Sequence, residues 1–282
     1  MGEILRWHPH PDVWALAAAL LGGYLYLVRR IGPRHATDGK EPVTRHQITM
    51  WFLGVVTLLV AADYPIHDLA ERSLYSVHMV QHLMFTMVMP PLLLLGMPAW
   101  MFRVLLARQP LRRVVKFLSR PFFALVLFNT VIVLTHWPAV VTAAVGHELV
   151  HFGIHAVLVF AALIMWMPVL SPVIEIPRLS YPGQMVYLFL QSLVPTVPAS
   201  FLTFGSRPLY HVYEAFTRPG GMSALTDQRM AGLIMKIVGG AILWGWIGVL
   251  FFRWYAMEKT GGVDALNWRD VDRQLNRMEL SK

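Results

Sequence analysis

The chain of 282 residues contains no cysteine, and only 14% of its residues are charged. Without cysteine there is no disulfide framework, no thiolate metal site and no thiol nucleophile, so any soft-metal chemistry depends on methionine and histidine. A soluble domain carries roughly 25% charged residues, whereas 56% of this chain is hydrophobic. Several apolar runs of about 20 residues accompany the deficit of charge. The composition therefore predicts an integral membrane protein, embedded in a lipid bilayer.

Seven apolar segments are long enough to cross a bilayer, and each is continuous rather than alternating, which favours helices. The predicted spans are residues 12–30, 47–66, 75–97, 121–138, 148–170, 181–205 and 229–256. The fold class is therefore all-α: a seven-helix transmembrane domain in residues 1–256 and a short tail in residues 257–282. Pro90, Pro91 and Pro195 fall inside or near the ends of spans and predict kinks.

Lysine and arginine lie mainly on one side of the predicted bundle, in the loops after the first and third spans and in the C-terminal tail. The basic residues on the opposite side are Arg6, Arg72, Arg207, Arg218 and Arg229. By the positive-inside rule, the N-terminus is outside and the C-terminus is cytoplasmic. Topology thus explains the net charge of +8, and nucleic acid is not predicted as a partner. The basic, amphipathic segment 98–120 is predicted to lie along the inner membrane surface.

Histidines, unlike lysines and arginines, lie mainly on the predicted outer side of the bundle. Of the 12 histidines, only His35 and His46 fall on the predicted cytoplasmic side. Those on the outer side are His8, His10, His67, His78, His82, His136, His147, His151, His155 and His211. Polar groups in membrane spans are costly and usually mark a functional path, so this concentration indicates a site near the outer surface.

The spacing of the histidines strengthens this interpretation. His78 and His82 are four residues apart and share one helix face, and His151 and His155 repeat the spacing in a later span. Neutral imidazole is the commonest metal ligand in proteins, and such pairs can grip one ion. The alternative is that these side chains only form hydrogen bonds between helices or with headgroup water.

Methionine and aspartate are candidates for further ligands. Met79 lies near the outer end of its span, where a thioether is suited to join imidazoles around Cu(I), and Met230 is placed similarly. The methionines deeper in the third span are predicted to pack. Asp227 opens the last span, where it is either a metal ligand or an N-cap. Lys236 in the same span is predicted to extend its ammonium outward.

Three stretches resemble the CtaG family of seven-span bacterial membrane proteins. They are HMVQHLMFTMVMPPLLLLGMP at 78–98, ELVHFGIH at 148–155 and DQRMAGLIM at 227–235, and the resemblance extends over nearly the whole chain. The residues that match the family pattern are His78, Met79, Gln81, His82, Pro90, Pro91, Gly96, Pro98, Glu148, His151, His155, Asp227, Gln228, Gly232 and Met235. His8, His10, His147 and His211 are not part of this pattern.

The resemblance implies a location in the bacterial plasma (inner) membrane and a role in assembling a caa-type cytochrome c oxidase. It also implies association with oxidase subunits and delivery of copper during oxidase maturation. Catalytic turnover is not implied, and the sequence offers no nucleophile–base set, phosphate loop or hydrolytic motif. The oligomeric state stays open.

The favoured hypothesis combines these observations in one copper site that faces the outer compartment. Its predicted ligands are His78, His82, His151 and His155, with Asp227 or Met79 as a further partner. A haem-binding oxidoreductase is the first alternative, because paired histidines also ligate haem iron. A metal permease is the second, and it requires polar groups that continue through the membrane. Gln184 and Gln191 are too few to define such a path.

Overall fold

The computed structural model describes residues 9–35 and 41–260, and these ranges are helical without any strand. The helices of the predicted spans are α1 (Pro11–Tyr26), α2 (Arg45–Ala62), α4 (Tyr75–Leu83), α5 (Met89–Gly96), α8 (Pro121–Thr135), α10 (Glu148–Leu170), α11 (Tyr181–Leu193), α12 (Thr196–Phe204), α13 (Ala224–Leu233) and α14 (Gly239–Thr260). Further helices connect them: α3 (Ile66–Arg72), α6 (Ala99–Leu105), α7 (Gln109–Leu118) and α9 (Pro138–Gly146). The predicted all-α class is confirmed.

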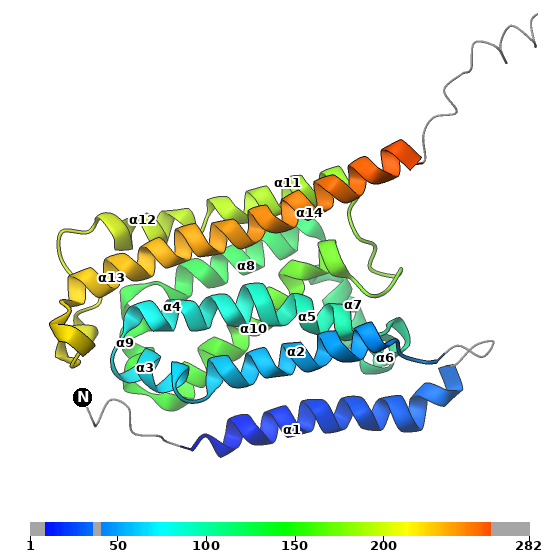
Figure 1. The fold of residues 1–282 in the computed structure, drawn as a ribbon, viewed down its shortest axis with the longest axis horizontal. Coiled ribbons are helices and arrows are strands. Elements are labelled where there is room, and N and C mark those ends of the chain that lie inside the picture. The colour runs from blue at the N-terminus through cyan, green and yellow to red at the C-terminus, as the bar shows by residue number, and fades with distance from the viewer. Residues whose placement is uncertain (1–8, 36–40, 261–282) are drawn as a thin grey trace, which may run out of the picture.

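The predicted spans correspond to helical segments that lie side by side in one bundle (Figure 1). Six segments in the described part of the chain are long and apolar enough to cross a membrane. The seventh candidate is α8, which reaches this length only together with α7 across a bend of 82°. α8 ends at Thr135, before the predicted end of its span, because Trp137 and Pro138 begin another helix. At the C-terminus α14 continues to Thr260, and the rest of the predicted tail lies outside the described residues.

Breaks in the spans occur where proline predicts them. A π-helical turn, Met84–Val88, joins α4 to α5 just before Pro90 and Pro91. Pro195 separates α11 from α12 in the sixth span. Two further π-helical turns, Leu27–Ile31 in the first span and Ile234–Val238 in the last, contain no proline. π-helical turns shift the register of a helix and are frequent at functional sites.

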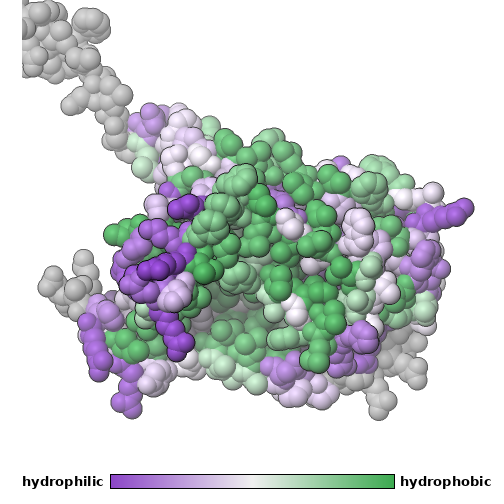
Figure 2. Space-filling view, turned by 180° about the vertical axis from the view of Figure 1, so that it is seen from behind, coloured by the Kyte–Doolittle hydropathy of each residue, from purple (hydrophilic) through white to green (hydrophobic). Residues whose placement is uncertain are grey.

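The third span, α4 with α5, forms the centre of the bundle. Within its apolar window 72% of the residues are buried, against 11% for α1, which packs at the edge against α2. The core beside this span contains Phe128 of α8 and Leu158 and Trp166 of α10, all fully buried. On the outside of the bundle apolar side chains form a broad band between hydrophilic ends (Figure 2). This surface suits lipid contact rather than water.

Glycine allows α2 and α5 to approach closely. A Cβ atom added at Gly96 would lie 2.4 Å from the backbone nitrogen of Trp51 and 2.7 Å from its Cα. The carbonyl of Gly96 also accepts a hydrogen bond of 3.0 Å from the Tyr24 hydroxyl, and the Tyr24 ring stacks on Trp51. Gly96 therefore joins the first three spans at one point, as small residues do in membrane helix interfaces.

Replacing Gly96 with alanine is expected to destabilise the bundle, because the new methyl group meets main-chain atoms that cannot rotate away. Overpacking typically costs about 1–3 kcal/mol. The measurement is thermal unfolding of the purified protein in detergent, in which Gly96→Ala should melt several degrees below the wild type. Gly245→Ala is the matched control, since an added Cβ there has no neighbour within 4 Å. Equal melting of both variants would contradict the close contact.

Candidate metal centre

The histidines of α4 are positioned by a carboxylate from another helix. α4 begins without a side-chain cap of its own. Instead, the two carboxylate oxygens of Asp227, in α13, accept hydrogen bonds from the backbone N–H groups of Tyr75 and Ser76 at 2.8 and 3.0 Å. Arg218 Nε lies 3.7 Å from the same carboxylate. A negative charge stabilises a helix N-terminus, so Asp227 fixes the start of α4.

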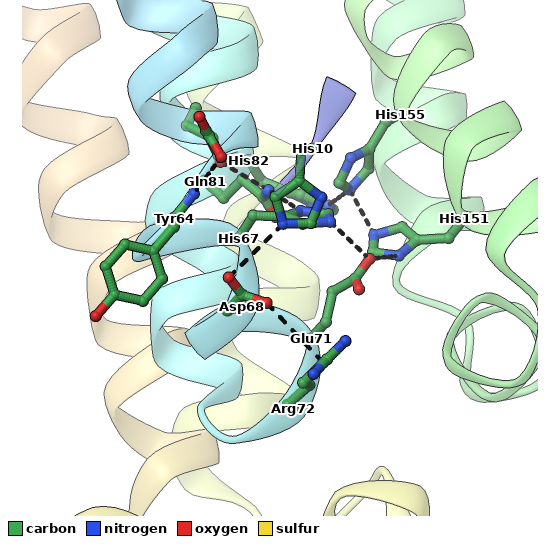
Figure 3. A network of polar contacts seen from close by, with 12 residues as sticks. His10, Tyr64, His67, Asp68, Glu71, Arg72, Gln81, His82, His151 and His155 are labelled. Carbon is green, nitrogen blue, oxygen red and sulfur yellow. Dashed lines mark hydrogen bonds and ion pairs between the residues drawn. The ribbon is translucent and has the colours of Figure 1, made fainter. Parts of the chain in front are cut away.

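α10 brings its histidines to those of α4 (Figure 3). One nitrogen each from His78, His82 and His155 lies within 4.8 Å of the other two, which is close enough for one metal ion. His82 Nε2 is 3.2 Å from His155 Nε2, and His151 Nε2 is 3.0 Å from the same atom. Pairs of ring nitrogens at this distance either share a proton or direct lone pairs towards a cation.

The cluster favours neutral imidazoles. His78, His82 and His155 line one space with His151, and protonating several of them would place like charges a few ångströms apart in a mostly buried region. Neutral imidazole is the form that ligates a metal. The packing of the two helices therefore holds these side chains in their ligand form.

A carboxylate that the sequence interpretation missed braces the cluster from outside. Glu71 Oε1, on α3, lies 2.5 Å from His151 Nδ1 and 3.3 Å from His67 Nε2. Gln81 Nε2 donates to Ala61 O at 2.8 Å and lies 3.1 Å from His67 Nδ1. Because Gln81 must donate, His67 Nδ1 accepts and its Nε2 carries the proton towards Glu71. Such outer partners orient ligands and raise their basicity.

The residues around the cluster line an open cavity of about 330 Å³. Its walls include Glu71, Glu148 and Tyr213 as well as the four histidines. Burial raises the pKa of Tyr213 well above that of a free phenol, so this side chain stays a neutral hydroxyl and offers no phenolate to a metal. Burial also raises the pKa of neighbouring Tyr210 to about 12. The carboxylates are thus the anionic groups that this wall contributes.

The other predicted site residues lie elsewhere. Asp227 uses both oxygens to cap α4 and is not among the residues that line the cavity. Met79 is buried and lines a different cavity with His82. Met230 is 41% exposed. His211 is exposed and pairs with Glu214 at 2.9 Å. His147 is exposed at the start of α10, and His8 lies outside the described residues.

The fold and the site together define a polytopic helical membrane protein with a carboxylate-braced histidine cluster near one end of the bundle. A family model described as "Cytochrome c oxidase caa3 assembly factor (Caa3_CtaG)" matches residues 22–257 of the chain. The chain therefore belongs to the family of caa3 cytochrome c oxidase assembly factors, as the sequence motifs predict. Membership implies a role in oxidase assembly rather than in catalysis. No curated protein and no solved structure matches significantly.

We expect Glu71→Gln to weaken metal binding about 10- to 100-fold, because loss of an outer carboxylate typically has this effect on histidine ligands. The measurement is a titration of the purified protein with Cu(I) against a chromophoric chelator. Glu214→Gln is the matched control, since Glu214 also pairs with a histidine but on an exposed loop. An unchanged Cu(I) affinity in Glu71→Gln would contradict the bracing role of Glu71.

Proposed function

We propose that the chain binds copper at the histidine cluster and donates it to a subunit of a caa3-type cytochrome c oxidase during assembly. The observation that carries this proposal is the convergence of His78, His82 and His155, whose ligand nitrogens lie within 4.8 Å of one another. Imidazole is a good ligand for copper. His151 contacts both His155 and Glu71 and so holds the cluster in place on one side. Membership in the family of oxidase assembly factors supports the oxidase as the client.

We further propose that the site faces the outer compartment of a bacterial plasma membrane. The helices near the cluster, α3 and α9, lie at the opposite end of the bundle from α6 and α7, which carry much of the basic charge (Figure 1). α7 leaves Leu111, Val114 and Phe117 exposed beside its arginines, as a helix lying on a membrane surface does. The positive-inside rule then assigns α7 to the cytoplasmic side.

Transfer requires a site that binds the ion and also releases it. Three imidazoles in a cavity of about 330 Å³ leave one side of the ion free for a ligand from a donor or an acceptor protein. A closed, four-coordinate site would instead retain the metal, as structural sites do. The size of the cavity therefore supports exchange with a partner rather than permanent storage.

The same geometry disfavours a haem. A haem with two axial histidines needs a flat slot between them that is free of other side chains. Here the rings of His78 and His151 also approach His155, with centroids 5.7 and 4.3 Å away. Four imidazoles in mutual contact suit a bare ion better than a macrocycle.

A permease is also less well supported. The buried polar groups deeper in the bundle form hydrogen bonds with one another: Asn129 donates to Gln191 at 2.7 Å, and Gln191 donates to the Tyr187 hydroxyl at 2.9 Å. Tyr187 donates in turn to Met165 O at 2.8 Å. These bonds join α8, α11 and α10, so they stabilise the bundle rather than define a transport path.

Copper content is the direct test. The wild type, purified in detergent after growth with copper, should contain near-stoichiometric copper by inductively coupled plasma mass spectrometry. His78→Ala combined with His151→Ala should lose it while the protein still inserts and elutes as a folded species. His147→Ala combined with His211→Ala, which replaces two exposed histidines, should retain the metal. Copper retained by the first double variant would refute the assignment of the cluster as the copper site. Iron in place of copper would favour the haem alternative.

The assembly role is tested in cells. Deletion of the gene should lower the activity of the caa3 oxidase, because an unmetallated subunit cannot support electron transfer, and added copper should restore part of it. Complementation with the wild type should restore activity at low copper, whereas the His78→Ala, His151→Ala variant should not. Full oxidase activity in the deletion strain at low copper would rule out a delivery role.

A further inference from the structure

A second, smaller cavity lies on the other side of His82 from the histidine cluster. Its volume is about 40 Å³, and it lies between the third span, α8, the junction of α11 with α12, and the last span. The lining side chains with nitrogen or sulfur atoms that could ligate a soft metal are His82, His136, Met79, Met87 and Met235. Only His82 among the histidines lines both cavities.

His136 is held as a metal ligand would be held. It follows the last turn of α8, and its Nδ1 lies 2.7 Å from the carbonyl oxygen of Ile132, so Nδ1 carries the proton and donates it. The lone pair is therefore on Nε2. That atom is buried and has no hydrogen-bond partner among the described residues. Ligating histidines typically use one nitrogen to donate to a carbonyl and the other to bind the metal.

His82 presents a second nitrogen of the same kind. Its Nε2 lies 3.2 Å from His155 in the outer cluster, whereas its Nδ1 is buried and has no partner in the described structure. Each of His82 and His136 is only 6% exposed, and their ring centroids are 6.0 Å apart. An unbonded buried nitrogen is destabilising, and His82 and His136 both line this cavity, so an occupant that bonds to them would relieve the cost.

The remaining ligands in this cavity are soft. Met79 is 1% exposed, and Met87 and Met235 are each 6% exposed, so their thioethers are removed from water. Thioether sulfur with imidazole selects Cu(I) among the common biological metals. The volume of about 40 Å³ exceeds the 10–15 Å³ that one water needs, so the cavity has room for an ion or for a water molecule.

We propose that this cavity is a second copper site, which binds Cu(I) through His136 Nε2, His82 Nδ1 and the thioethers of Met79 and Met235. The transfer step rests on the proposed outer copper site, whereas Cu(I) binding in the cavity does not. A neutral imidazole has one lone pair, so His82 ligates the outer ion through Nε2 while the inner site is empty and the inner ion through Nδ1 once that site is filled, and with both sites filled the outer ion keeps His78 and His155. His82 thus passes one ion inward as its proton changes nitrogen. Copper remains Cu(I), and no electron is transferred.

The inner cavity reaches the side of the bundle. Exposed Lys236 and half-buried Gly240 are among its lining residues, and a Cβ atom added at Gly240 would have no neighbour within 4 Å. The π-helical turn Ile234–Val238 and the break at Pro195 place irregular backbone beside this opening. The flexible stem of Lys236 lets its ammonium point away from the ion. The opening gives the ion a route from the cavity to a client, which the proposed transfer requires.

The test uses the full chain in detergent, loaded anaerobically with Cu(I) buffered by a chromophoric chelator. The wild type should bind about two Cu(I) ions per chain, and X-ray absorption should detect sulfur as well as nitrogen ligands. Met79→Leu combined with Met235→Leu should halve the stoichiometry and remove the sulfur signal, while nearly conserving volume. Met89→Leu combined with Met101→Leu is the matched control, because both residues are buried in a different core cluster and neither lines the cavity.

The outcomes separate the two copper sites. His151→Ala combined with His155→Ala should leave one ion with sulfur ligands, which isolates the inner site. Wild-type Cu(I) bound only by nitrogen would overturn the inner site and leave the outer site standing. Sulfur ligands that persist in the Met79→Leu, Met235→Leu variant would also overturn it. A wild type that binds no Cu(I) would overturn both sites and leave water as the occupant of the cavity.

Discussion

The structure depends on one constraint: a polar group within the bilayer must find its partner inside the protein. The bundle meets this constraint wherever its helices are irregular. At the π-helical turn between α4 and α5, the Thr86 hydroxyl donates to the carbonyl of His82 at 2.7 Å, and the Trp166 indole donates to the carbonyl of Thr86 at 2.9 Å. Carbonyls at this irregular turn are thus satisfied by local and neighbouring side chains. The break that separates the histidines from the apolar end of the span therefore destabilises the bundle little.

The same constraint gives meaning to polar atoms that remain unbonded. His82 Nδ1 and His136 Nε2 are among the buried side-chain atoms of the described residues that have no hydrogen-bond partner. Structural histidines in a membrane protein would use both nitrogens, because an unbonded one is destabilising. Their retention beside a cluster of three further imidazoles is consistent with a ligand that supplies the missing bonds. A metal ion does this without adding bulk.

Sequence analysis predicted the helices and the histidines of the candidate cluster because both depend on local regularities. Continuous apolar runs define the spans, and the spacing of His78 and His82 fixes their common face whatever surrounds them. The role of Glu71 could not be predicted in this way. α2 ends at Ala62, and Glu71 lies in α3, a separate short helix whose direction is set by packing. Asp227 illustrates the same limit. It caps a helix that begins 152 residues earlier in the chain, rather than the helix in which it lies.

This distant cap explains how the last span affects the outer histidine cluster without contributing a side chain to it. Asp227 sets the position of the first turn of α4, and His78 and His82 follow within the next two turns. Gly232, one turn and a half beyond Asp227, lets α13 pack against α12, since an added Cβ would lie 2.8 Å from the carbonyl oxygen of Ala199. A shift of α13 therefore moves the start of α4 and, with it, the histidines. Binding of a client against the last span would act on the histidine cluster through this connection.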